Sequence, residues 1–440
     1  MNACFFKFTL KNKRIEQIIF KTICQFIWLN PSEQKSNQDI TQIKVLRTMN
    51  MYQIKRNTFF LGACLATFIA SPVFAKELSI GNADSDLGKL AFSGWLRANI
   101  QDKDYSDDDH KLKFDAAKIA IKYDANRFFG NFEYRCYQFD TLCDFSTLVN
   151  ANIGYKFNSD HKLTVGVQDI PFGPGRGWST NWYGGILVNA GLEDVHNLGF
   201  NFQSNLTDST KIDLAYFIRD AGNYIGNSKD SSRYTANFVK SNNPADTSLV
   251  EKNMFIARID QQIPLNIEDF KLSLGGSYWH SQLDNKTDAE TGNRKSWAFF
   301  SRAKYKDFNL TLTGGKNKVS NKDPRHPDYS VVGSFDSTYN VANNADFYTV
   351  DLNYVYQDPN SRYSLTPYLT YSLYKKNVAA YKDSTRNVIG AQLDVKQFSV
   401  AAEYIIGKND PFINGSANSL TTGDDNQNNK MLNLLLFYNF

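Results

Sequence analysis

The most regular pattern in the chain is a two-residue alternation of apolar and polar side chains in its last segment, 430–440. Counting back by twos from Phe440, the residues on one face of an extended strand are apolar: Tyr438, Leu436, Leu434 and Leu432. Such a face needs apolar surroundings, which either the core of a soluble sandwich or the lipid around a membrane barrel supplies. The pattern therefore predicts a strand and leaves both folds open.

The same alternation recurs upstream. From residue 76 onward it marks sixteen segments: 90–100, 112–123, 128–139, 149–157, 163–168, 198–206, 211–220, 253–264, 271–283, 295–306, 309–319, 346–357, 363–375, 386–396, 398–408 and 430–440. Short turns such as 124–127 alternate with long loops such as 221–252 and 321–345. A β-sandwich is not expected to keep its long loops at one end, whereas a bacterial barrel does. We predict an all-β fold: a transmembrane antiparallel up-and-down β-barrel of sixteen strands.

The third long loop, 170–194, differs from the others in composition. It reads IPFGPGRGWSTNWYGGILVNAGLED and is rich in Gly and aromatic residues. A loop of this composition is better suited to packing than to exposure in solvent. Trp182 and Tyr183 are candidates for lining a path for sugar rings, and packing against the barrel wall is the simpler expectation for both.

Composition agrees with strands that are apolar on one face only. Aromatic residues reach 14%, yet hydrophobic residues total 42% and the mean hydropathy is -0.45. No run of about 18 apolar residues follows residue 75, which argues against membrane-spanning helices.

Residues 49–75 have the anatomy of a signal peptide. A basic start precedes an apolar stretch over 59–70, and small residues end at Ala75, so we expect the mature chain to begin at Lys76. The sequence before Cys64 resembles a lipobox, but its apolar stretch is too short for a lipoprotein signal.

Three segments follow from this division. We interpret residues 1–48 as an extension from a mis-set start codon, 49–75 as the signal and 76–440 as one barrel domain. The first 75 residues hold 10 of the 49 basic and 3 of the 45 acidic residues, so the net charge changes from +4 to about -3 on their removal. Net charge therefore gives no support for a nucleic-acid partner.

Two of the five cysteines remain after this removal, Cys136 and Cys143, which can close a loop by a disulfide or stay as thiols.

Charged residues occupy the face opposite the apolar rows. The basic candidates for selectivity on this inner face are Arg97, Lys118, Arg135, Arg219, Arg258 and Arg302, with Lys122 and Lys304 on the same face. The acidic ones are Glu133, Asp213, Asp260, Asp351, Asp394 and Glu403. Opposed charges across a wet lumen create a field that sets ion preference. Local pairing that merely keeps the lumen wet is the alternative for each residue.

The sequence offers little for catalysis. Its five histidines form no pair at metal-ligand spacing, and neither a G-x-S-x-G elbow nor a P-loop is present. We expect no enzyme, no metal site and no cofactor.

Two stretches carry a family resemblance: VGVQDIPFG at 165–173 and NAGLEDVHNLGF at 189–200. They resemble bacterial outer-membrane porins of the phosphate-selective O/P type and their relatives. The resemblance implies a channel of sixteen strands, with the third loop folded into the lumen, and a homotrimer. Arg176 is the only basic residue of that loop, beside acidic Glu193 and Asp194, so the resemblance does not extend to phosphate as the solute.

The C-terminal row ending in Phe440 similarly resembles the insertion signal of outer-membrane proteins, which implies the outer-membrane assembly machinery and lipid as partners. We therefore expect a porin of the bacterial outer membrane for passive diffusion of small hydrophilic solutes or ions. A substrate-specific sugar or anion channel is one alternative. A barrel adhesin or receptor that acts through loops 221–252 and 321–345 is another.

Overall fold

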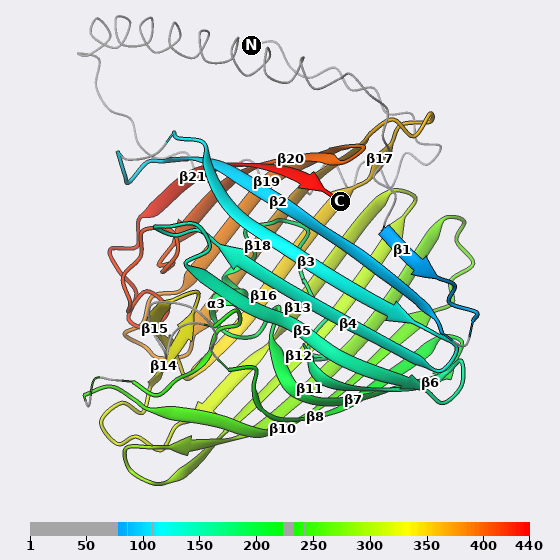
Figure 1. Cartoon of the computed structure of the whole chain (residues 1–440). Coiled ribbons are helices and arrows are strands. Elements are labelled where there is room, and N and C mark those ends of the chain that lie inside the picture. The colour runs from blue at the N-terminus through cyan, green and yellow to red at the C-terminus, as the bar shows by residue number, and fades with distance from the viewer. Residues whose placement is uncertain (1–77, 86, 108–109, 223–232, 242, 244) are drawn as a thin grey trace, which may run out of the picture. The chain divides into compact units, whose positions relative to one another are not determined.

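The computed structural model describes residues 78–85, 87–107, 110–222, 233–241, 243 and 245–440, and the description below is confined to them. The predicted extension (1–48) and signal (49–75) lie outside these residues. The described chain is dominated by one antiparallel sheet that closes into a barrel (Figure 1).

Sixteen strands of the described chain form the ring. They are β2 (Lys89–Lys103), β3 (Lys113–Asp124), β4 (Phe128–Tyr137), β5 (Phe145–Lys156), β6 (His161–Asp169), β7 (His196–Thr207), β8 (Thr210–Asp220), β10 (Leu249–Ile263), β11 (Phe270–Asn285), β12 (Thr291–Tyr305), β13 (Phe308–Ser320), β16 (Asn344–Tyr354), β18 (Ser364–Lys376), β19 (Ser384–Val395), β20 (Phe398–Lys408) and β21 (Asn428–Asn439). Each pairs with its neighbours along the chain, and β21 pairs with β2 to close the ring without a free edge. Two short strands extend it, β1 (Leu78–Gly81) beside β2 and β17 (Tyr356–Gln357) beside β18. The prediction of a sixteen-stranded barrel is confirmed.

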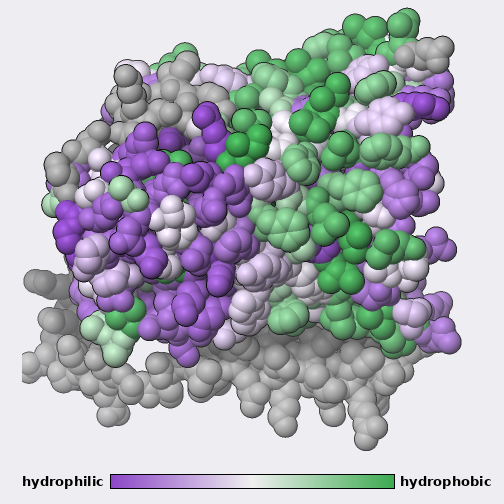
Figure 2. Space-filling model, turned by 90° about the horizontal axis from the view of Figure 1, so that it is seen from below, coloured by the Kyte–Doolittle hydropathy of each residue, from purple (hydrophilic) through white to green (hydrophobic). Residues whose placement is uncertain are grey.

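Apolar side chains at alternate strand positions point outward. In β21, Leu432 and Tyr438 are 47% and 44% exposed, whereas Leu435 and Phe437 on the other face are 4% and 3% exposed. Seen from one side, hydrophobic side chains gather over the strand wall and hydrophilic ones over the end that bears the long loops (Figure 2). This division gives the wall a surface that lipid can cover.

The two ends of the barrel differ. One end, called here the turn end, carries short connections such as 125–127, 208–209 and 306–307, and the loop end carries the long ones. None of the described helices is both long and apolar enough to cross a membrane.

Charged residues, which the sequence places on the inner face, do not occupy all of it. Toward the loop end, a hydrophobic core fills part of it, with Ile256, Trp279 and Phe347 buried on the inner face. Over this core lies a small sheet from other loops, formed by β9 (Asn237–Phe238), β14 (Tyr329–Ser334) and β15 (Ser337–Ala342). The inner face is therefore apolar where loops cover it.

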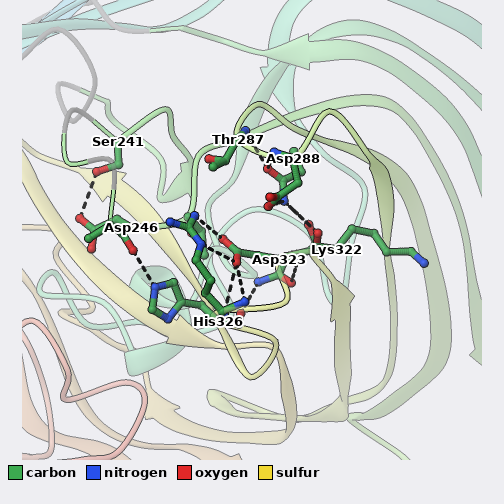
Figure 3. Close-up of polar contacts among 12 residues, drawn as sticks. Ser241, Asp246, Thr287, Asp288, Lys322, Asp323 and His326 are labelled. Carbon is green, nitrogen blue, oxygen red and sulfur yellow. Dashed lines mark hydrogen bonds and ion pairs between the residues drawn. The ribbon is translucent and has the colours of Figure 1, made fainter.

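Polar contacts tie the loops after β8, β11 and β13 together (Figure 3). His326 Nε2 donates to the carbonyl of Ala245 over 2.6 Å, and its Nδ1 accepts from the Tyr329 hydroxyl over 2.9 Å. The Asn285 amide donates to the Lys322 carbonyl over 3.0 Å. These bonds hold the loop end in one arrangement.

Candidate functional site

The loop between β6 and β7, residues 170–195 and called loop 3 here, is bonded to the inner face of distant strands. The Thr180 N–H donates to Asp351 Oδ1 of β16 over 2.9 Å, and the Trp182 N–H donates to Glu403 Oε1 of β20 over 2.6 Å. Loop 3 therefore crosses the interior rather than extending outward. The α-helix α3 (Ile186–Asn189) lies within it.

Aromatic packing explains the apolar composition of loop 3. The rings of Phe172 and Trp178 lie 5.6 Å from Trp279 and 5.8 Å from Phe347, respectively, on the wall. Gly173 between them has φ +62°, and a Cβ there would come within 2.5 Å of the Trp178 ring. Only glycine fits this turn without displacing the indole.

Two predicted selectivity residues hold this same turn. Arg258 donates from Nε to the Gly173 carbonyl over 2.9 Å and from Nη2 to the Pro174 carbonyl over 3.0 Å, while its Nη1 pairs with Asp213. Arg302 reaches Pro174 over 3.5 Å. Arg258 therefore acts as an anchor for loop 3.

Four other predicted cations come together on and beside β2–β4. The charged groups of Arg97, Lys118 and Arg135 lie 5.1, 5.7 and 5.8 Å from the ring centroid of Trp95. Arg176 of loop 3 reaches the same wall through an ion pair with β4. We call Arg97, Lys118, Arg135 and Arg176 the basic cluster.

Three carboxylates face the four cations of the basic cluster. The pairs are Arg97–Asp115, Arg135–Glu133, Arg176–Glu133 (3.1 Å) and Arg176–Asp194 (3.1 Å). Lys118 makes no hydrogen bond or ion pair with any described residue, so its charge is the uncompensated one. A wall with one excess positive charge favours anions near it.

Asp194 joins loop 3 to both the wall and another loop. Its Oδ1 lies 3.0 Å from His196 Nε2, and its Oδ2 accepts from the Tyr234 hydroxyl over 2.6 Å. Burial raises the pKa of this carboxyl, but the His196 hydrogen bond and the Arg176 and Arg135 charges outweigh it and hold the pKa well below its usual range. Tyr234 gave no signal in the sequence, because it belongs to a long polar loop.

The surroundings of Glu193 shift its pKa in the direction opposite to that of Asp194. Its Oε1 accepts from the Trp178 N–H over 2.7 Å and from Ser179 Oγ over 3.1 Å, while its Oε2 has no hydrogen-bond partner among the described residues. Burial, opposed by these two bonds, raises the pKa of Glu193 to about 7. Glu193 and Asp194, both candidate residues from the sequence, are therefore neighbours whose pKa values are shifted in opposite directions.

The two aromatic candidates of loop 3 have different surroundings. Trp182 is 38% exposed, and its Nε1 donates to Gln392 Oε1 over 2.7 Å. The Tyr183 hydroxyl donates to the Phe412 carbonyl over 3.0 Å, and its ring lies 5.0 Å from the Arg386 guanidinium. Both rings pack against the wall, since the Trp182 ring also lies 4.6 Å from that of Phe437 in β21, but Trp182 keeps a partly open face.

Arg219 points outward, whereas the sequence predicted an inward orientation. A register shift between Leu198 and Gly199 leaves Ile218 unpaired, so Arg219 pairs with Leu198. Paired residues point to the same face, and Leu198 belongs to the outward row of Phe200. Arg219 is exposed and lies apart from the basic cluster.

Two further sequence features have a place in the structure. Cys136 and Cys143 are joined by a disulfide at the end of β4, with Cα atoms 5.0 Å apart. No group of three or more His, Cys, Asp or Glu residues suited to a metal ion occurs among the described residues.

No protein-family model and no curated protein sequence matches this chain. Its fold is similar to that of solved structures. The outer membrane channel DcaP of Acinetobacter baumannii is 12% identical, with 82% of this chain and 100% of that chain covered and a TM-score of 0.52. OmpF of Salmonella typhi, in complex with daunomycin, is 14% identical, with the same coverage and a TM-score of 0.53. The likeness establishes a shared barrel fold.

Proposed function

We propose that the chain is a porin of the bacterial outer membrane, through which small hydrophilic solutes or ions diffuse passively. The observation that carries this proposal is the basic cluster on the inner wall, opposite an apolar outer surface. The Arg176 side chain stays 32% exposed, and Trp182 is partly open as well. Aperture and field then set selectivity without any chemical step.

The excess positive charge at Lys118 gives this channel a preference for anions. The field acts on ions that pass the wall of β2–β4, where loop 3 brings Arg176 opposite Arg135. The partly open indole of Trp182 also supports a channel that guides sugar rings, which is a finer form of the same function.

A second candidate function is a receptor or adhesin that acts through the long loops. It is supported by the packing at the loop end, where the Tyr339 hydroxyl of β15 donates to the Asn189 carbonyl of loop 3 over 2.9 Å. Burial and the loss of hydration raise the pKa of Tyr339, in keeping with a closed contact. A barrel filled by such contacts would pass no current.

Conductance separates the two functions. The protein, extracted from the outer membrane, is reconstituted in a planar bilayer, and single channels are recorded under a salt gradient. Open steps with a reversal potential of anion sign support the proposed porin. Silence from protein whose circular dichroism shows a folded barrel supports the receptor.

The proposal includes export and assembly. Processing after Ala75 would leave Lys76 as the first residue, which N-terminal sequencing of the membrane-inserted protein tests. Insertion by the outer-membrane assembly machinery and a homotrimeric state are supported by the porin resemblance in the sequence. Chemical cross-linking before extraction tests the trimer.

A further inference from the structure

The hairpin formed by β14 and β15 reaches across the loop end of the barrel. It belongs to the connection between β13 and β16, which are the eleventh and twelfth strands of the ring. Its tip, residues 334–337, contacts the ends of β4 and β5, the third and fourth strands. Eight of the sixteen positions in the ring separate these two places, so the hairpin starts at one wall and ends at the opposite one. It therefore spans the mouth of the barrel.

The tip of this hairpin has an unusual residue for its backbone conformation. Phe335 and Asp336 have φ values of +47° and +66°, the signs that a two-residue type I′ turn requires. Asn and Gly favour such a turn, because a bulky side chain is disfavoured at positive φ. Phenylalanine at this position therefore strains the turn, and contacts of its ring elsewhere have to compensate for the strain.

The Phe335 ring lies in an aromatic pocket on the opposite wall. Its centroid is 5.4 Å from that of Tyr137 at the end of β4 and 5.8 Å from that of Phe145 at the start of β5. The ring of Tyr234 lies 5.6 Å away. We call Tyr137, Phe145 and Tyr234 the latch pocket. Aromatic pairs at these distances are favourable, and the Phe335 N–H also donates to the Arg233 carbonyl over 2.7 Å, so the tip is fastened to this wall.

The latch pocket adjoins the basic cluster and is held in place without the hairpin. The Tyr234 hydroxyl accepts from Arg135 Nη1 over 3.0 Å and donates to Asp194 Oδ2 over 2.6 Å. The next residue, Thr235, accepts from the His196 N–H over 3.0 Å. These bonds attach the pocket to β4 and loop 3. The hairpin tip therefore ends next to the residues that hold Arg135.

The root of the hairpin has attachments of its own. There the Ala342 N–H donates to the Leu420 carbonyl over 3.0 Å, and the Tyr339 hydroxyl joins β15 to α3 of loop 3 (Figure 1). Toward the tip, β14 pairs with the two-residue strand β9, and Ser337 and Thr338 are exposed. Release of the Phe335 ring would therefore free the tip while the root stays attached.

We propose that the β14–β15 hairpin is a lid at the mouth of the channel, with Phe335 as the latch that holds it closed in the latch pocket. The proposal rests on the proposed channel function and describes how that channel is closed. Strain in the turn opposes the contacts of the ring, which brings the closed and open positions closer in free energy. Movement of the tip changes the fraction of time that the channel is open. The size of each open step, which loop 3 sets, stays the same.

Spin labels on the full protein in detergent measure the position of the lid. One label is attached at Ser337→Cys, beside the tip, and the other at Ser159→Cys, in the exposed turn after β5. In this background, Phe335→Asn removes the ring and supplies a residue that suits the turn, so the hairpin itself should stay folded. We expect the ratio of longer to shorter label distances to rise by at least about tenfold, the amount that three aromatic contacts represent.

The matched control for this change is Phe139→Asn. Phe139 stacks on Phe145 of the latch pocket at 5.7 Å, but it belongs to the loop closed by the disulfide rather than to the hairpin. This variant should change the distance ratio by less than about twofold, since the contacts of Phe335 remain. An equal increase in both variants, or no increase in Phe335→Asn, would overturn the latch.

Bilayer recordings separate this inference from the porin proposal. In a conducting protein, Phe335→Asn should raise the ratio of open to closed time by about tenfold and leave the conductance of the open step unchanged. Open channels with the same ratio in wild type and variant, together with unchanged label distances, overturn the lid and keep the channel. A tip that moves in protein that never conducts overturns the channel and keeps the latch.

Discussion

The backbone N–H of Trp182 donates to Glu403 Oε1 over 2.6 Å, joining positions 221 residues apart. Glu403 is fully buried on β20 and also accepts from the Tyr368 hydroxyl over 2.9 Å. A buried carboxylate needs such donors, and here one of them is supplied by loop 3. Glu403 on the far wall therefore fixes loop 3, and its carboxylate is unavailable to passing solutes.

Replacement of this carboxylate should loosen loop 3. Glu403→Ala removes the acceptor for Trp182, and hydrogen bonds to charged groups contribute about 1.5–3 kcal/mol each. We expect a lower melting temperature in detergent together with larger and more variable single-channel conductance.

The matched control for this change is Asp358→Ala. Asp358 is a buried acid that pairs with Arg362 in a turn and makes no bond to loop 3. The variant Asp358→Ala should lower the melting temperature while leaving the distribution of single-channel conductance unchanged. A narrow, unaltered distribution in Glu403→Ala would show that this contact does not fix the aperture.

The uncompensated cation of the basic cluster should set the sign of ion preference. Lys118→Gln removes one charge without breaking an ion pair. The interaction energy between two unit charges about 10 Å apart in water is about 0.4 kcal/mol. Losing this energy corresponds to about a twofold change in the anion-to-cation permeability ratio. Reversal potentials in a salt gradient measure this ratio.

Arg219→Gln is the control for Lys118→Gln, because it removes the same charge from the outer face. Its reversal potential should equal that of the wild type. If both variants shift the potential equally, the overall charge of the protein, rather than the inner wall, determines selectivity.

The sequence predicted the strands well because period-two patterning reports directly which face meets lipid. It also predicted the inward orientation of Arg97, Lys118 and Arg135, since inward parity depends only on counting from an apolar neighbour, and it singled out Arg176 as the only basic residue of the third long loop. Counting fails where a bulge inserts a residue, as it does before Arg219. Contacts between loops, such as Tyr234 with Asp194, have no local signal because they depend on how distant segments fold together.

The apolar inner face was missed for a related reason. Trp279 and Phe347 lie on inner rows, and their burial depends on loop 3 covering them. A periodicity rule describes one strand and its two faces, and it does not show which part of an inner face another segment occupies.

The disulfide at the end of β4 should stabilise the protein without affecting conduction. Cys136 and Cys143 are seven positions apart, and loop closure of this length contributes about 2.5 kcal/mol in the chain-entropy model. We expect Cys136→Ser/Cys143→Ser to lower the melting temperature and to leave single-channel conductance unchanged. Mass spectrometry of the unreduced wild type should find the two cysteines linked, and free thiols there would contradict the assignment.

Glu193 should make the stability of the protein fall as the pH rises. Its pKa in the folded protein is about 7, compared with 4.5 for an ordinary glutamate, because burial disfavours the charged form. Between these two values the folded state binds more protons than the unfolded state, so the free energy of unfolding decreases with rising pH and levels off above about 7. The full change is on the order of 3 kcal/mol.

Glu193→Gln removes this titration while keeping an oxygen to accept from Trp178 and Ser179. The difference in melting temperature between variant and wild type, measured in detergent from pH 4 to pH 8, cancels the other titrating groups. We expect this difference in melting temperature to be small near pH 4. It should grow in favour of the variant as the pH rises to about 7. The exposed turn residue Glu268 provides the control, since Glu268→Gln should show no such trend. A constant difference across the whole range would mean that Glu193 has the same pKa in the folded and unfolded states. It would then be ionised at neutral pH in the folded protein, and Oε2 must have a partner there.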